Sequence, residues 1–202
     1  MDILYFDREL AVIIKPVGMD SEHAVPAAII EKLGGEVFPI HRLDLNVGGV
    51  MVYARTKQAA AQLSKLVQEG QLVKEYRCLV HGTPPEGGVW EDLLFKDSRK
   101  NKVFVVKKER KGVKKASLEY TRLTDSDPSL VHIRLHTGRS HQIRVQFSSR
   151  GLPLVGERKY STLEDPCELA LWSCHLAFTH PHTGAFMEFE LSPPEVYPWI
   201  SC

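Results

Sequence analysis

The most informative part of the sequence is residues 39–54, which read PIHRLDLNVGGVMVYA. Its end, residues 50–54, is a short apolar run preceded by two glycines, a pattern typical of a buried strand. The part before the glycines carries Arg42 and Asp44 and is expected to form a tight loop that leads into this strand. A loop on a rigid strand can hold a side chain in one direction. On these residues alone, the simpler interpretation is that Asp44 closes a turn and Arg42 is a solvated charge.

The composition is that of a globular protein. The chain has 202 residues, of which 43% are hydrophobic and 25% are charged, which is enough for a buried core. Since no run of about 18 apolar residues occurs, we expect no membrane span, and the first residues lack the pattern of a signal peptide. The four cysteines show no metal-ligand spacing and favour free thiols in a reducing cytosol. We therefore expect a cytoplasmic protein.

The charge of the chain is unevenly distributed. The net charge is only +1, but residues 96–115 hold ten basic and two acidic residues, a net +8 that leaves −7 for the rest. Such asymmetry indicates a phosphate-rich partner. A solvated basic hairpin without a partner explains it almost equally well.

Strands dominate the predicted secondary structure. Helices are expected only at residues 26–33, at 57–69 with Thr56 as N-cap, and from Arg139 onward. The strand order lacks the alternation of a βαβ protein, so we predict an α+β fold around a mixed, largely antiparallel sheet, in one domain over residues 1–202. The predicted strands are residues 2–6, 10–14, 50–54, 73–80, 103–106, 116–123, 130–137, 169–178 and 185–191.

Several short motifs follow one another along the chain. They are KPVG at 15–18, HRLD at 41–44, KEY at 74–76, GRSHQIR at 138–144 and PLVG at 153–156. In this order they resemble the RluA-type pseudouridine synthases over nearly the whole chain. The resemblance implies a pseudouridine-synthase catalytic domain, here without the N-terminal S4 domain of many members. It also implies an isomerase that converts uridine in RNA to pseudouridine and needs no metal or cofactor.

The resemblance also implies roles for individual residues. Asp44 matches the nucleophile, and Arg144 matches the arginine that pairs with it and keeps it ionised, which a lysine could not do bidentately. Tyr76 matches the tyrosine that stacks on the uracil and is a candidate for removing the C5 proton. Arg42 resembles the arginine that fills the space left by the flipped base. Which carbon Asp44 attacks stays open.

Other residues are expected to contact RNA. Arg139 and Gln142 support the site or touch RNA, and four lysines of the basic segment clamp the phosphate backbone. The expected partner is a stem-loop of ribosomal or transfer RNA, bound by a monomer without membrane or metal. His180 and His182 alone are weak grounds for a metal site. The four lysines are Lys107, Lys108, Lys111 and Lys114.

The match to the family pattern has gaps. After HRLD the family usually has two variable residues and then Thr-Ser-Gly, whereas this chain has Val47 and Gly48 in place of Thr-Ser. The usual Asp after the second proline motif is Glu157, and the usual Asn before Lys-Pro is Ile14. The lost hydroxyls motivate an alternative, a catalytically impaired RNA-binding protein of the same fold. An unrelated hydrolase or phosphotransferase is disfavoured because no glycine-rich phosphate loop or paired acidic metal site accompanies Asp44.

Overall fold

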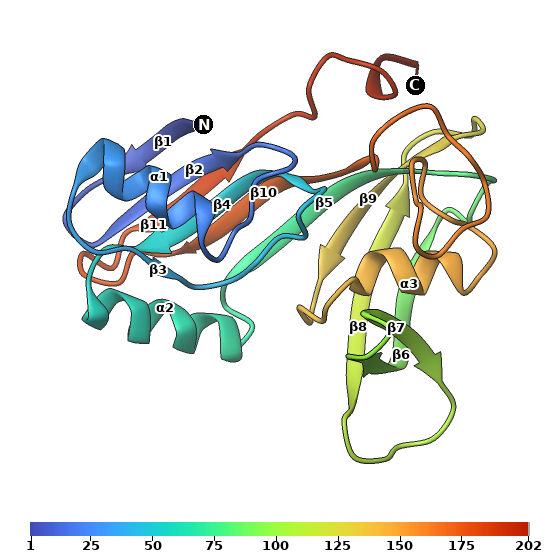
Figure 1. The fold of residues 1–202 in the computed structure, drawn as a ribbon, viewed down its shortest axis with the longest axis horizontal. Helices are drawn as coiled ribbons and strands as arrows, with labels where there is room; N and C mark the ends of the chain where they lie inside the picture. Colours follow the sequence, from blue (N-terminus) through green and yellow to red (C-terminus); the bar gives the residue numbers. More distant parts are fainter. Residues whose placement is uncertain (202) are drawn as a thin grey trace. The chain divides into compact units, whose positions relative to one another are not determined.

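The computed structural model describes residues 1–201, which form two compact units (Figure 1). The first unit comprises residues 1–74 and 172–193, and the second comprises residues 75–171 and 194–201. The predicted α+β class with a largely antiparallel sheet is confirmed. The assignment of residues 1–202 to a single domain stays a prediction. In the described part of the chain, no helix has the length and apolar character needed to cross a membrane.

The sheet of the first unit is built around β4 (Gly48–Ala54). This strand pairs antiparallel with β2 (Leu10–Lys15), and β2 pairs with β1 (Asp2–Phe6). On its other side β4 pairs in parallel with β10 (Leu171–Thr179). Two short partners complete the sheet: β11 (Phe186–Glu190) on β10 and β3 (Phe38–Pro39) on β4.

All seven residues of β4 are buried, which explains its continuous apolar sequence. Alternate residues of β4 point to opposite faces of the sheet. On one face, α2 (Lys57–Gln68) packs Ala59 and Leu63 into a cluster with β2, β4 and β10. Thr56 caps this helix as predicted, because its hydroxyl accepts a hydrogen bond from the N–H of Ala59 at 3.1 Å. The remaining helix of this unit is α1 (Ala24–Leu33).

The sheet of the second unit is antiparallel throughout. Its strands lie side by side in the order β5, β9, β8, β6 and β7. The helix α3 (Gln142–Ser148) packs on it through Val145, which lies in a cluster with Leu94 and Val103. A 3-10 turn, Trp199–Ser201, ends the described chain. The strands are β5 (Val73–Val80), β6 (Gly87–Asp97), β7 (Lys102–Val106), β8 (Val113–Arg122) and β9 (Ser129–Leu135).

Two strands were not predicted from the sequence, and the last helix begins later than predicted. Residues 87–95 belong to the long strand β6, although Gly87 and Gly88 indicated a turn. The short strand β3 had no strand signal. The last helix begins at Gln142 and not at Arg139, because His141 adopts a left-handed conformation with φ of 50°.

Candidate active site

Asp44 lies on a loop whose backbone is fixed on both sides of it. The carbonyl of Leu43 accepts a hydrogen bond from the hydroxyl of Ser21 at 2.9 Å. The carbonyl of Leu45 accepts from the N–H of Gly18 at 2.8 Å. The carbonyl of Asp44 accepts from the N–H of Val47 at 3.0 Å and closes a turn. The half-buried Asp44 side chain therefore starts from an anchored backbone.

Lys15 is the buried cation of this loop. Its side chain is fully buried, and its ammonium donates to the carbonyls of Pro16 and Met19 at 2.8 Å and of Leu45 at 3.2 Å. Burial lowers the pKa of Lys15 to about 8, although the negative charges of Asp20 and Asp44 act in the opposite direction. The KPVG motif thus contributes a charged group that ties the residue after Asp44 to the preceding strand.

His41 and Arg42 differ in their surroundings. Burial, with the charge of Lys74, lowers the pKa of His41 to about 3. His41 is therefore neutral, and its Nε2 accepts the N–H of Val52 at 3.3 Å. Arg42 is exposed and pairs with the carboxylate of Glu22 at 3.1 Å. Such an exposed pair contributes little energy, so Glu22 holds Arg42 only weakly.

Gly48 explains one departure from the family pattern. A Cβ on Gly48 would overlap the ring of Trp172, its partner in the parallel pairing of β4 with β10. At Gly49, φ is 122° and a Cβ would overlap the backbone of Ser173. The ring of Trp172 thus lies where a serine side chain would need space.

In the second unit, Arg144 is held by a buried carboxylate. Arg144 lies on α3, and 8% of its surface is exposed. Its Nε and Nη2 donate to Glu157 at 2.6 and 2.8 Å. The ring of Tyr160 lies 5.5 Å from the guanidinium carbon. In the sequence, Glu157 is only a departure from the family pattern, because nothing local indicates its pairing with Arg144.

The turn before α3 uses most of its polar groups internally. The amide oxygen of Gln142 accepts from the hydroxyl of Thr137 at 2.8 Å and from the N–H of Arg139 at 3.0 Å. Arg139 is exposed, and its Nε donates to the carbonyl of Lys115 at 2.9 Å. Gln142 itself is buried. These contacts give both residues a place in the turn, and their contact with RNA stays a prediction.

Tyr76 lies on β5, paired with Ile133 of β9, and it is buried with 5% of its surface exposed. It belongs to the second unit with Arg144, whereas Asp44 and Arg42 belong to the first. The structure therefore defines the surroundings of each predicted residue within its own unit. The meeting of Asp44 with Arg144 and Tyr76 stays a prediction.

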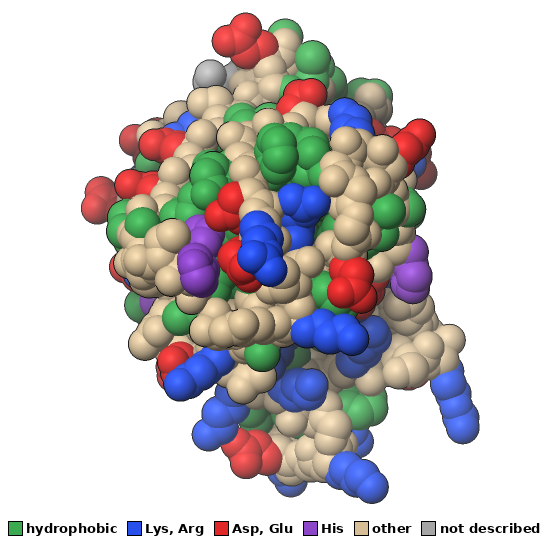
Figure 2. Space-filling view, turned by 90° about the vertical axis from the view of Figure 1, so that its left-hand side faces the viewer, with side chains coloured by type: hydrophobic (Ala, Val, Ile, Leu, Met, Phe, Trp, Pro, Cys, Tyr) green, Lys and Arg blue, Asp and Glu red, His purple; other side chains and the backbone are tan. Residues whose placement is uncertain are grey.

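The basic segment spans the end of β6, all of β7 and the loop of residues 107–112 that leads into β8. Figure 2 shows Lys and Arg side chains gathered at the lower end of the molecule, where Figure 1 places this loop. The predicted strand at residues 103–106 is confirmed as β7, which forms a hairpin with β6. The four lysines predicted to clamp RNA are all exposed.

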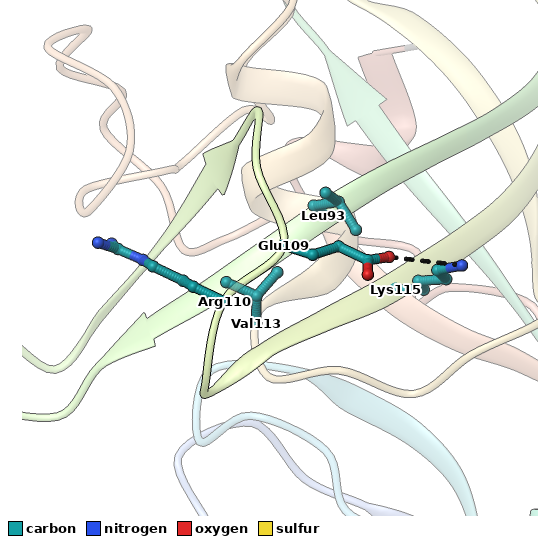
Figure 3. A pocket seen from close by; sticks show the side chains of 5 residues that line it. All are labelled: Leu93, Glu109, Arg110, Val113 and Lys115. Carbon is teal, nitrogen blue, oxygen red and sulfur yellow. Dashed lines mark ion pairs between the residues drawn. The ribbon is translucent and has the colours of Figure 1, made fainter.

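A pocket of about 430 Å³ lies beside the loop (Figure 3). Leu93 and Val113 supply its apolar part, and Lys115 is paired with Glu109 at 3.5 Å. Arg110 points away from this pair and lies over the ring of Phe95, 4.5 Å from its centroid. Two of the basic side chains of the segment are thus engaged within the protein itself.

The histidines considered as metal ligands have structural partners. Nε2 of His180 lies 2.8 Å from the carboxylate of Asp7, and its Nδ1 accepts the N–H groups of His182 and Thr183 at 3.1 Å. Within residues 1–201, no group of three or more metal-ligating side chains comes together. His180 therefore fixes the turn between β10 and β11.

Comparison with known proteins gives a consistent result. The family model described as RNA pseudouridylate synthase matches residues 9–149. An uncharacterized RNA pseudouridine synthase of Aquifex aeolicus is 32% identical over 231 residues, covering 99% of this chain and 73% of the relative. Ribosomal large subunit pseudouridine synthase D of Zymomonas mobilis is 28% identical, and the alignment covers 96% of this chain and 70% of that relative.

Solved structures share the fold. Human RNA Pseudouridylate Synthase Domain Containing 4 aligns with a TM-score of 0.79 over 95% of this chain and 88% of its own, at 24% identity. Human RNA Pseudouridylate Synthase Domain Containing 1 aligns with a TM-score of 0.80 over 97% of this chain and 84% of its own, at 23% identity. At these identities the alignments establish the fold alone.

Proposed function

Because this chain belongs to the RNA pseudouridylate synthase family, we propose that it isomerises uridine in ribosomal or transfer RNA with Asp44 as the nucleophile. The chain is an RNA pseudouridine synthase, and such enzymes are isomerases. One observation carries the assignment of Asp44: the HRLD motif lies on a loop whose carbonyls on both sides of Asp44 are fixed by hydrogen bonds. A fixed backbone reduces the number of directions that a short carboxylate can take.

The reaction requires three changes at one nucleotide. The bond between N1 of uracil and C1′ of ribose breaks, the detached base turns, and its C5 forms a new bond to C1′. The proton on C5 is then lost and N1 gains one, so the product is an isomer of the substrate. In our proposal the carboxylate of Asp44 forms the temporary covalent bond, to the sugar or to the base, and leaves when the new bond is complete.

Three further residues complete the proposed site. Arg144 pairs with Asp44 in the working enzyme and keeps it ionised in a site that excludes water. Tyr76 stacks on the uracil and accepts the C5 proton. Arg42 leaves its exposed pair with Glu22 and takes the space of the flipped base, where a planar cation can stack on the neighbouring bases.

The RNA substrate is proposed from the relatives and from the charge of the chain. Relatives named ribosomal large subunit pseudouridine synthase D favour ribosomal RNA over transfer RNA. A loop of a stem-loop suits the mechanism because an unstacked base is easier to flip. Lys107, Lys108, Lys111 and Lys114 then bind the backbone beside the target, while Arg139 and Gln142 support the site. The expected monomer and the cytoplasmic location stay predictions.

The test is tritium release from RNA labelled at C5 of uridine, with RNA from cells that lack the gene as substrate. The Asp44→Asn variant should lower the release rate by at least about a thousandfold, because an amide cannot form and break the covalent bond. Its affinity for the same RNA should stay within about threefold of wild type, since the substitution is isosteric and lies outside the basic loop. Turnover by Asp44→Asn would refute the nucleophile assignment. Absence of release by the wild-type chain on all cellular RNA would instead favour the impaired RNA-binding alternative.

A further inference from the structure

The buried pair between Arg144 and Glu157 is an additional feature of the candidate site. Glu157 has 1% of its surface exposed, and its two carboxylate oxygens accept from Nε and Nη2 of Arg144. This is the side-on bidentate geometry that fixes the plane of a guanidinium. The pair therefore determines the orientation of Arg144 and not only its charge.

Glu157 is itself held in place by the segment that follows the PLVG motif. Its Oε1 also accepts the N–H groups of Lys159 at 2.7 Å and of Tyr160 at 3.2 Å. Gly156, with φ of 77°, packs so closely on the backbone of Glu168 that a Cβ would overlap it. The carboxylate is thus directed at α3 by a turn that leaves little freedom.

The electrostatics of Glu157 agree with an ionised carboxylate. Burial alone would raise the pKa of Glu157, but the hydrogen bonds and charge of Arg144, with the N–H groups of Lys159 and Tyr160, lower it overall. Tyr160 also contacts the guanidinium face, and its hydroxyl lies 2.7 Å from Nδ1 of His141 and accepts the N–H of Val103 at 2.9 Å. The motif before α3 and the segment after PLVG therefore form one polar cluster around Arg144.

We propose that Glu157 is a positioning residue, which orients Arg144 so that its other edge pairs with Asp44 during catalysis. A guanidinium carries five N–H donors, and Glu157 engages the Nε edge. The edge formed by Nη1 is the one that Arg144 would turn to a second carboxylate. This inference rests on the proposed role of Arg144 in the reaction.

The experiment compares Glu157→Gln, Arg144→Lys and the double variant in the tritium-release assay. Glutamine keeps the shape and one acceptor but loses the charge and the bidentate geometry. Glu157→Gln should lower kcat about 10- to 100-fold, with KM for the RNA within about twofold, because a misoriented group affects the reacting complex more than binding. In the Arg144→Lys background the same change should have no further effect on kcat, since Glu157 acts through the guanidinium.

Two results would overturn the inference. One is wild-type kcat for a folded Glu157→Gln chain, and the other is an equal loss in the presence and absence of Arg144. If Glu157→Gln does not fold in thermal denaturation, Glu157→Asp decides by the same two measurements, because the shorter side chain keeps the charge but moves the carboxylate away from the position that now orients the guanidinium. An active Asp44→Asn variant would refute the nucleophile assignment on which the role of Arg144 rests, whereas an inactive Asp44→Asn beside a fully active Glu157→Gln would refute only the role of Glu157.

Discussion

At Gly48 the backbone of β4 runs directly against the ring of Trp172. An added Cβ would overlap ring carbons of Trp172, and the carbonyl of Lys15 would lie only 3.2 Å away. Glycine here is therefore a packing requirement, four residues after the candidate nucleophile. The absence of a hydroxyl at this position follows from the ring beside it and does not by itself indicate a lost activity.

The serine usual in the family should consequently destabilise this chain. We expect Gly48→Ser to lower the free energy of unfolding by about 2 kcal/mol, because a buried overlap forces the ring or the strand to shift. In the Trp172→Ala background the same change should cost at least about 1 kcal/mol less. Urea denaturation of the four chains measures this coupling. Gly88→Ser is the control, since a Cβ there meets no atom closer than 3.6 Å; additive effects of Gly48→Ser and Trp172→Ala would contradict the explanation.

Because of Lys15, we expect stability and activity to change in opposite directions as the pH rises above about 8. Its pKa of about 8 in the folded chain lies below the ordinary 10.5, so the folded state binds fewer protons between these values. The stability that Lys15 contributes should therefore rise with pH in this interval. Activity should fall above pH 8, because a neutral amine has two N–H donors for three carbonyls and the bond to Leu45 is the longest.

The comparison with Lys15→Met tests both parts. The difference in unfolding free energy between wild type and Lys15→Met, from urea denaturation between pH 7 and 9.5, should shift in favour of wild type as the pH rises. The single-turnover rate of wild type should decline near pH 8. The rate of Lys15→Met should be lower than that of wild type and should show no such decline near pH 8. A wild-type rate that stays constant to pH 9.5 would exclude a role for the ammonium in holding the Asp44 loop.

At the scale of elements, the loop of residues 107–112 and the start of β8 can be tested as a phosphate-binding surface. A variant with glutamine in place of Lys107, Lys108, Lys111 and Lys114 should show a shallower plot of log affinity against log salt concentration. The slope should decrease in magnitude by up to about 3, since each phosphate contact on single-stranded RNA contributes about 0.7 to it. Fluorescence anisotropy with a labelled ribosomal RNA stem-loop from 50 to about 300 mM salt measures the slope. The control replaces the exposed Lys32, Lys57 and Lys65; an equal change per charge in both variants would mean that the loop acts only through net charge.

Elements with a strong local pattern were predicted from the sequence, and elements that depend on distant partners were not. The seven-residue apolar β4 and the capped helix α2 carry their signals within a few residues. The strand β6 opens with two glycines and contains Glu91 and Asp92, so its pattern resembles a turn. It is a strand because β7 and β8 pair with it on both sides.

In the candidate site, too, features with a local sequence pattern were predicted and contacts between distant segments were not. Asp44, Tyr76 and Arg144 were singled out by short motifs, which need no knowledge of packing. The pairing of Arg144 with Glu157 and the contact of Trp172 with Gly48 join segments whose proximity exists only in the fold. Neither contact changes the local pattern of the sequence, so neither could be read from it.

For the whole molecule, the decisive pairing joins a strand in the first third of the sequence to one in its last third. Gly48 and Gly49 of β4 pair with Trp172 and Ser173 of β10, so the first unit cannot complete its sheet before the last part of the chain is present. Leu176 and Phe178 of β10 also belong to the apolar cluster under α2. A contact of such high sequence separation carries a large loop-closure cost and depends on the rest of the fold.

A chain that ends at Leu171 should therefore fail to fold cooperatively. The edge of β4 would lose its parallel partner, and the cluster around Leu63 would lose two large side chains. We expect no cooperative thermal transition by near-UV circular dichroism and aggregation in size-exclusion chromatography. A chain that ends at Pro193 keeps β10 and β11 and loses mainly the packing of Trp199 on the cluster around Leu79, so it should melt cooperatively at a lower temperature. Cooperative melting of the shorter chain would show that β4 does not need β10.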